Sequence, residues 1–113
     1  MTVQNILIVS GTHGNEINPI WAANQFKKEE KDTDNNIGYK YIIGNPLAYE
    51  KGCRYLDADL NRSFHAIKNN LHGNKNIYEI NRADFLLEQF GIKGKEPCEI
   101  AIDLHITTSN MGT

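Results

Sequence analysis

Histidine and acidic side chains near both ends of the sequence are of the types that bind metal ions. His13 and Glu16 are separated by two residues in GTHGNE, and His105 follows much later, after the apolar run CEIAIDL. Two imidazoles and one carboxylate make a catalytic zinc set that leaves a fourth position open for water. A zinc ion there lowers the pKa of water to about 7. Magnesium and calcium prefer oxygen ligands, so the sequence predicts one Zn²⁺.

The H-x-x-E pattern alone is weak evidence, because many helices contain it by chance and a single histidine is more often a surface residue. The placement of these residues favours the metal, because His13 and His105 each follow an apolar, strand-like run, and Gly14 allows a tight turn beside His13. His65 and His72 lie in a polar stretch without such placement. We interpret both as ordinary polar residues.

Asp103 and His105 are two residues apart, so in a strand their side chains point to the same side. A histidine that binds a metal usually donates its second N–H to a carboxylate or a carbonyl. Asp103 is therefore a candidate partner for His105. An aspartate that only caps the loop after the strand is an equally good interpretation.

The segment RYLDADLNR at residues 54–62 places Arg54 and Arg62 on either side of an alternating pattern. Alternation of apolar and polar residues predicts a short extended piece with one buried side. Two guanidinium groups suit the recognition of a substrate with several carboxylates. The alternative is that each arginine pairs with a local acid such as Asp57 or Asp59.

These side chains need a scaffold, and the apolar runs predict an α/β fold with a mostly parallel sheet and flanking helices. Ligands of such sheets bind beyond the carboxyl ends of the strands, where His13 and His105 are expected. Ile17, Ile20 and Trp21 recur at helical spacing in the first helix. Residues 47–76 are expected to be irregular. The expected strands cover 3–9, 39–43 and 98–104, and the expected helices cover 16–28 and 76–90, the second with Ile80, Ala83 and Leu87 on its apolar face.

Composition limits the class of protein. The chain of 113 residues fits one domain, with 40% hydrophobic and 23% charged residues. Twelve basic residues against 14 acidic ones give a net charge of −2, which argues against a nucleic-acid or membrane surface. The first apolar run is too short for a signal peptide. Cys53 and Cys98 are interpreted as free thiols in a reducing cytoplasm.

Four segments in order resemble the aspartoacylase and succinylglutamate desuccinylase family, whose fold is that of the zinc carboxypeptidases. They run from near the first residue to nearly the last, and the stretch after His105 resembles the aspartoacylase branch. The segments are GTHGNE at 11–16, GNPLA at 44–48, RYLDADLNR at 54–62 and DLHITTSNMG at 103–112.

The resemblance implies zinc ligands at His13, Glu16 and His105, and substrate contacts by Arg54, Asn61 and Arg62. Arg62 could also polarise the scissile amide. The implied reaction is hydrolysis of the amide of a small N-acyl amino acid, N-acetyl-L-aspartate above all, to acetate and L-aspartate. Succinylglutamate desuccinylation, and a non-catalytic zinc- or anion-binding module, remain alternatives.

In the family the general-base glutamate and a C-terminal β domain follow the third ligand. Residues 1–113 are therefore expected to be the N-terminal part of a catalytic domain, with no catalytic residue besides the metal ligands and the base beyond Thr113. Glu96 and Glu99 precede the third strand and are not assigned as the base. We expect the chain alone to be a poor catalyst, with an uncovered sheet edge that favours a homo-oligomer or aggregation.

Overall fold

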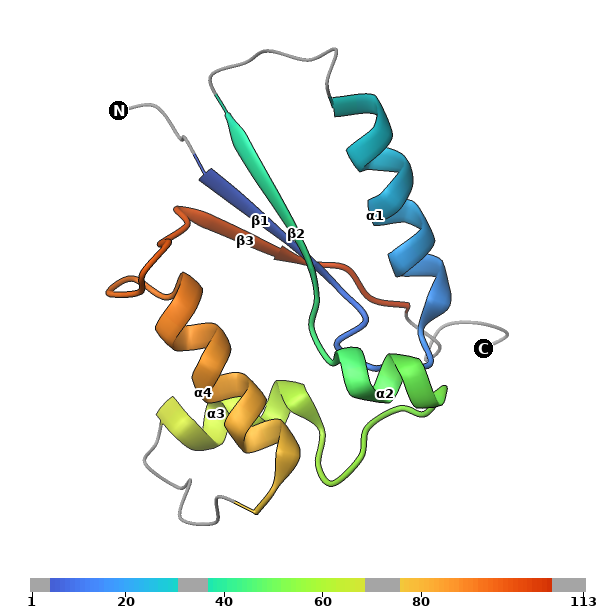
Figure 1. The fold of residues 1–113 in the computed structure, drawn as a ribbon, viewed down its shortest axis with the longest axis vertical. Helices are drawn as coiled ribbons and strands as arrows, with labels where there is room; N and C mark the ends of the chain where they lie inside the picture. Colours follow the sequence, from blue (N-terminus) through green and yellow to red (C-terminus); the bar gives the residue numbers. More distant parts are fainter. Residues whose placement is uncertain (1–4, 31–36, 69–75, 107–113) are drawn as a thin grey trace, which may run out of the picture.

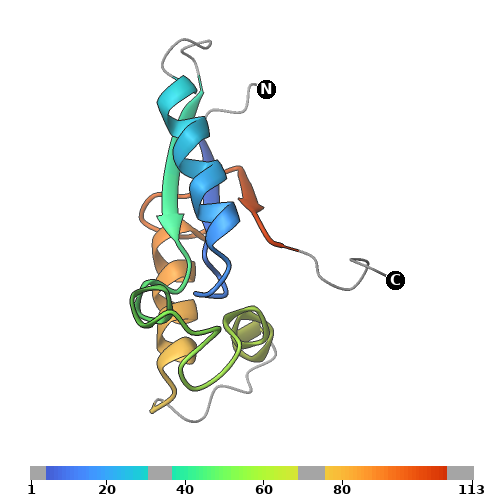
Figure 2. The same ribbon diagram turned by 90° about the vertical axis from the view of Figure 1, so that its right-hand side faces the viewer.

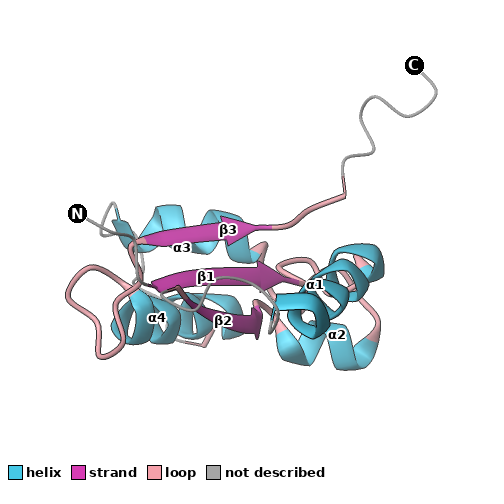
Figure 3. Cartoon of the chain, turned by 90° about the horizontal axis from the view of Figure 1, so that it is seen from above, coloured by secondary structure: helices cyan, strands magenta, loops and turns pink. Residues whose placement is uncertain are grey.

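The computed structural model describes residues 5–30, 37–68 and 76–106. Its strands are β1 (Asn5–Ser10), β2 (Gly38–Ile43) and β3 (Ile100–Asp103). They form one parallel sheet in the order β2-β1-β3, with β1 between the other two strands (Figure 3). The parallel α/β fold expected from the sequence is confirmed. All three strands end at the same edge of the sheet, so the segments that follow them lie close together.

In the described residues four helices flank this sheet (Figure 1): α1 (Ile17–Glu29), α2 (Pro46–Lys51), α3 (Leu60–Lys68) and α4 (Tyr78–Phe90). The side chains of β1 alternate between the two faces, so that Ile8 points toward α1 and Leu7 toward α3 and α4. Both side chains are only 6% exposed. The central strand is therefore covered on both faces, which explains its nearly continuous apolar sequence.

The α3–α4 pair forms the largest apolar cluster in the part of the chain that the structure describes. Leu60, Ala83 and Leu86 are buried at its centre. The partly buried side chains packed against them are Ile42, Phe64, Ile67 and Phe90. This cluster fixes the beginning of α3 against α4, and the beginning of α3 carries Asn61 and Arg62.

Residues 46–51 and 60–68 are helical, so the expectation of an irregular segment at 47–76 is wrong for these parts. The side chain of Asn45 accepts a hydrogen bond from the N–H of Ala48 at 3.2 Å and caps α2, in which Pro46 opens the first turn. The side chain of Asp59 accepts one from the N–H of Asn61 at 3.0 Å at the start of α3. The extended piece expected across 54–62 is therefore not found, because residues 54–59 form a bent loop and α3 begins at Leu60.

The two longer helices present slightly different faces from those expected. In α1, Ile20 is buried but Trp21 is 64% exposed. In α4, Leu86 is buried, whereas Leu87 is 41% exposed. Apolar spacing located both helices correctly but did not select which of two neighbouring apolar residues faces the sheet.

The strand β3 is less well covered than its neighbours. In Figure 2, α1 lies over β1 and β2, and β3 lies to one side of it. Ile100 and Ile102 point to the α1 face and are each 41% exposed. None of the helices in the described residues is long and apolar enough to cross a membrane.

Candidate metal centre

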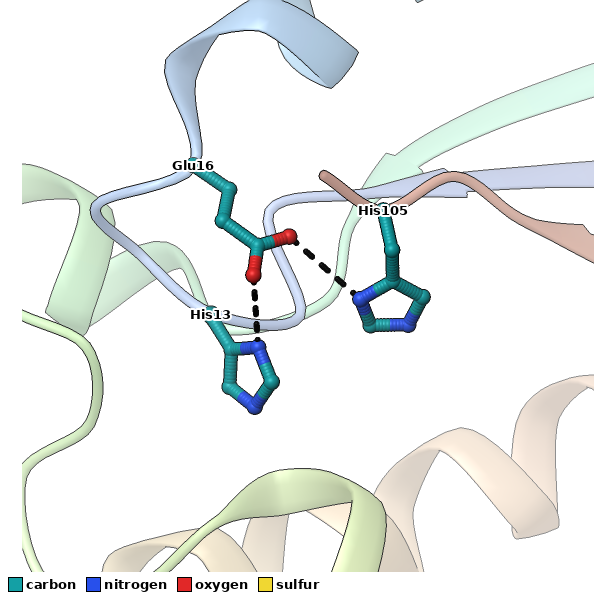
Figure 4. A group of neighbouring side chains, drawn as sticks. All are labelled: His13, Glu16 and His105. Carbon is teal, nitrogen blue, oxygen red and sulfur yellow. Dashed lines mark hydrogen bonds and ion pairs between the residues drawn. The ribbon is translucent and has the colours of Figure 1, made fainter. Parts of the chain in front are cut away.

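The three predicted metal ligands converge at the carboxyl edge of the sheet (Figure 4). His13 lies in the turn after β1, Glu16 directly precedes α1, and His105 follows β3. One ligand atom from each residue can be chosen so that all three lie within 4.8 Å of one another. The two imidazole rings are 5.5 Å apart between centroids, so both histidines lie at the same edge of the sheet.

The carboxylate of Glu16 stands between the two imidazoles. Its Oε2 lies 2.9 Å from Nδ1 of His13, and its Oε1 lies 3.3 Å from Nδ1 of His105. Ligand atoms on a tetrahedral zinc ion, with bonds of 2.0–2.1 Å, are separated by roughly 3.3 Å. Both Nδ1 atoms therefore face the same point, at spacings that suit a small divalent ion.

The second nitrogen of each imidazole also has an acidic partner. Nε2 of His13 lies 3.0 Å from Oδ2 of Asp59, and Nε2 of His105 lies 2.9 Å from Oδ2 of Asp103. A metal ion on Nδ1 would leave the proton on Nε2, where these carboxylates can accept it. Thr12 donates to the other oxygen of Asp103 at 2.9 Å. The whole donor set therefore fits a metal held by two neutral histidines and one carboxylate.

Two of these acids have shifted pKa values. Burial of Glu16 raises its pKa, but the contact with His13 and the N–H of Ile106 outweigh burial and hold the pKa below its usual value. Asp59 behaves in the same way, because burial is outweighed by the contact with His13, and its pKa is also lowered. Both groups are therefore anionic at neutral pH, as metal binding requires.

The local backbone explains why His13 and Glu16 sit so closely. Gly14 packs directly on α2, where an added Cβ would lie 2.3 Å from the carbonyl carbon of Ala48. Its N–H donates to the carbonyl of Arg54 at 3.0 Å. Gly11 has a φ of 69°, which L-residues with a side chain rarely adopt. The turn after β1 is thus fixed against α2 and against Arg54, the first residue of the segment 54–62, which we call the arginine-bearing segment.

The three predicted substrate-binding residues lie on the segment that contains Asp59. The guanidinium of Arg54 is 3.9 Å from Oδ2 of Asp59, and its side chain is 55% exposed. Asn61 and Arg62 are exposed in the first turn of α3. Arg62 also lines a pocket of about 350 Å³ together with Tyr55 and Asp59. Asp59 connects this segment to the metal ligands through His13.

Three polar residues around the site were not identified from the sequence. Asp59 and Asn45 belong to segments that the sequence singles out, but neither is predicted to act at the metal centre. No role there is predicted for Glu79 either. Glu79 is fully buried in the first turn of α4 and accepts four hydrogen bonds. A hydrophilic residue at a helical position that should face the core was the available signal.

His65 is exposed on α3 and is not one of the grouped ligands, whereas His72 and residues 107–112 lie outside the described residues.

Comparison with known proteins places this geometry in context. The family described as the succinylglutamate desuccinylase/aspartoacylase catalytic domain matches residues 2–113. A protein of Prochlorococcus marinus strain MIT 9215 named probable aspartoacylase is 68% identical over 113 residues, which are 100% of this chain and 38% of the relative. The chain thus spans little more than a third of the length of that relative.

Two solved structures share the fold. A mutant of murine aminoacylase 3 superposes with a TM-score of 0.74 at 29% identity and covers 93% of this chain and 35% of its own. The succinylglutamate desuccinylase from Chromobacterium violaceum superposes with a TM-score of 0.69 at 26% identity, covering 91% of this chain and 33% of its own. Both similarities extend over almost all of residues 1–113.

Proposed function

The chain belongs to the succinylglutamate desuccinylase/aspartoacylase family, and on that premise we propose that the protein is a zinc-dependent hydrolase of N-acylated acidic amino acids. We propose N-acetyl-L-aspartate as the substrate, because a relative at 68% identity bears the name probable aspartoacylase. The observation that carries the proposal is the convergence of His13, Glu16 and His105 on one point.

In this proposal one zinc ion per chain is held by Nδ1 of both histidines and by the Glu16 carboxylate. A bound zinc ion supplies a Lewis acid that polarises a carbonyl and lowers the pKa of water at its open position. Asp59 and Asp103 hold the opposite nitrogens of the two rings and so fix which nitrogen faces the ion. The protein contributes the orientation of the ligands and keeps Glu16 ionised.

The arginine-bearing segment would recognise the substrate. Guanidinium groups bind carboxylates with two parallel hydrogen bonds, and Arg54 and Arg62 are both exposed to solvent near Asp59. Asn61 adds an amide that can contact a substrate carboxylate or carbonyl. A substrate with two or three carboxylates therefore suits this surface better than an acylated amino acid whose only carboxylate is the α-carboxylate.

The test uses the longest open reading frame that encodes residues 1–113, expressed and loaded with zinc. The release of free amino acid is measured with N-acetyl-L-aspartate, N-succinyl-L-glutamate and N-acetyl-L-alanine. We expect the highest kcat/KM with N-acetyl-L-aspartate. We expect no turnover of any of the three substrates by the His13→Ala variant. A preference for N-succinyl-L-glutamate would replace the proposed substrate with that of a desuccinylase. Zinc binding without turnover of any of the three would support a non-catalytic module instead.

The variant Arg54→Ala separates substrate binding from chemistry. We expect Arg54→Ala to raise KM for N-acetyl-L-aspartate much more than for N-acetyl-L-alanine, because only the first substrate carries a side-chain carboxylate. Equal effects on both substrates would make Arg54 a structural partner of Asp59.

Residues 1–113 expressed alone should hydrolyse N-acetyl-L-aspartate slowly, because the proposal assigns no general base among them and such a group typically contributes a factor of about 10²–10⁴ in rate.

A further inference from the structure

Glu79 carries a fully buried carboxylate at the beginning of α4. One oxygen, Oε1, accepts hydrogen bonds from the backbone N–H groups of Asp57 and Ala58, both at 3.0 Å. The other, Oε2, accepts from the N–H of Leu56 and from the side-chain amide of Asn45, both at 2.8 Å. All four donors are neutral, so the carboxylate is satisfied by hydrogen bonds and not by an ion pair.

The contact between α4 and the arginine-bearing segment runs in both directions. While Glu79 accepts from the segment, the side chain of Asp57 accepts from the N–H of Tyr78 at 2.8 Å, next to Glu79 in the chain. The backbone of residues 56–58 is therefore held to the first turn of α4 by reciprocal bonds. An exposed loop needs such fixed partners to keep one conformation, because it has no ladder of its own.

The segment held by Glu79 leads directly to the metal centre. Ala58 precedes Asp59, whose Oδ2 lies 3.0 Å from Nε2 of His13. At its other end the carbonyl of Arg54 accepts from the N–H of Gly14, which follows His13. The orientation of the His13 ring thus depends on residues 54–59, and the central part of these residues depends on Glu79.

The charge of Glu79 is suited to this task. Burial raises the pKa of a carboxyl group, but here the N–H groups and the Asn45 amide outweigh burial, and the pKa is lowered. A glutamine at this position would turn an N–H₂ toward at least one backbone N–H. One buried donor would then lose its acceptor, which weakens the contact between α4 and residues 56–58.

We propose that Glu79 is a positioning residue of the metal centre, which holds the backbone of residues 56–58 so that Asp59 meets His13 and the two arginines face the substrate. The inference rests on the proposed metal site and on no particular substrate. It assigns to α4, which carries none of the ligands, an effect on metal affinity that acts through residues 56–59.

Zinc affinity and hydrogen exchange test this role in the longest polypeptide that contains residues 1–113. The variants are Glu79→Gln, Glu79→Asp and Ala23→Gly, the last as a control. Ala23 is 4% exposed on α1, and glycine there lowers helix stability without touching residues 56–58. Zinc affinity is measured by competition with a chelator, and amide exchange is followed at residues 56–58 without metal.

We expect Glu79→Gln to weaken zinc binding by about 10–100-fold, the range for residues that orient metal ligands, and to speed exchange of the 56–58 amides. Glu79→Asp keeps the charge and should recover part of both. Ala23→Gly should change neither, even though it destabilises the fold. Unchanged zinc affinity in Glu79→Gln, or an equal loss in Ala23→Gly, would overturn the proposal.

Two safeguards keep the result interpretable. If Glu79→Gln does not fold, the exchange rates of the wild-type amides at 56–58 decide the question, because the proposal requires protection comparable to that of the central strand and rapid exchange contradicts it. The second safeguard concerns turnover. Zinc affinity and exchange do not involve N-acetyl-L-aspartate, so a failure of the proposed activity leaves both results intact.

Discussion

The two halves of the metal centre are built in different ways. The β1 turn, residues 11–16, is buried, with His13 at 5% and Glu16 at 9% exposure. The β3 edge, residues 100–106, is open, and the side chain of His105 is 31% exposed. Both regions supply imidazole Nδ1 atoms to the same point. Only the first is enclosed by other elements of the described chain.

This difference separates two ways of holding a ligand. His13 is fixed on both sides, by Glu16 and by Asp59, inside a turn that packs on α2. His105 is fixed by Glu16 and Asp103, but Asp103 itself belongs to a poorly covered strand. The β1 turn should therefore keep its shape without metal, whereas the β3 edge should gain order when the metal binds.

The largest expected effect on stability comes from adding a side chain at Gly14, where the β1 turn packs closely on α2. Gly14→Ala would place a Cβ 2.3 Å from backbone atoms of Ala48, which cannot move away as a side-chain tip could. We expect the free energy of unfolding to fall by about 3 kcal/mol or more, at the upper end for overpacking. Gly52→Ala is the control, because its φ of 68° disfavours alanine but nothing lies within 4 Å. Equal losses in urea unfolding would contradict this packing argument.

Removing one histidine at a time compares the halves directly. Without metal, His13→Ala leaves the buried Glu16 and the partly buried Asp59 without their common partner, and we expect a loss of about 1–3 kcal/mol in unfolding free energy. His105→Ala acts at an exposed position, where substitutions usually change stability by less than about 0.5 kcal/mol. Thermal unfolding of the metal-free variants measures both. If His105→Ala is the more destabilising change, the β3 edge is more rigid than its exposure indicates.

Acid should act mainly through the buried carboxylate of Glu79, which lies outside both halves and holds the backbone of residues 56–58. The pKa of Glu79 lies below its ordinary value of 4.5, so its ionised form contributes stability that is complete above that value. This contribution is lost as the pH falls through the lowered pKa of the folded state. Glu79→Gln should flatten the fall in unfolding free energy by up to about 1.4 kcal/mol per pH unit. Glu96→Gln is the control, because Glu96 lies on the surface beside Lys40 and should alter the profile less.

The smallest effect on folding is expected at the β3 edge. Ile102 is 41% exposed, so Ile102→Lys should change the unfolding free energy by less than about 0.5 kcal/mol. The same change should reduce self-association of residues 1–113, because a charged side chain on an uncovered strand opposes pairing with another chain. Sedimentation velocity at several concentrations measures this. Self-association that is unaffected by Ile102→Lys would place the contact elsewhere.

The sequence predicted the parts of the fold that repeat a simple pattern. The strands and the helices α1 and α4 follow from apolar runs and helical spacing, because burial on one or two faces leaves a periodic trace. Helix α2 was missed although Asn45 and Pro46 form a capping signal, since the same residues are also typical of a turn. Helix α3 was missed because LDADLNR alternates as a strand would, and its contacts with α4 override that pattern.

The sequence predicted the candidate ligands and also Asp103, the partner of His105, but not Asp59, the partner of His13. His13, Glu16 and His105 have residue types and positions that indicate a metal. Asp59 and Glu79 act through contacts between segments that are distant in sequence, so spacing and residue type can mark Glu79 as a polar residue at a core-facing position but cannot reveal which residues either one contacts. The alternative that Arg54 pairs with a local acid has a counterpart in the structure, where its guanidinium lies 3.9 Å from Asp59.

Zinc binding by three single-histidine variants decides whether the proposed metal centre exists. We expect one zinc per chain, with two imidazole nitrogens and one carboxylate oxygen at about 2.0–2.2 Å in the X-ray absorption spectrum. His13→Ala and His105→Ala should each weaken binding by roughly 300- to 8,000-fold, which corresponds to one third of an apparent binding free energy of about 10–16 kcal/mol. His65→Ala, on the exposed side of α3, should bind as the wild type does. If His13→Ala or His105→Ala retains wild-type affinity, the metal is held elsewhere and the account is wrong.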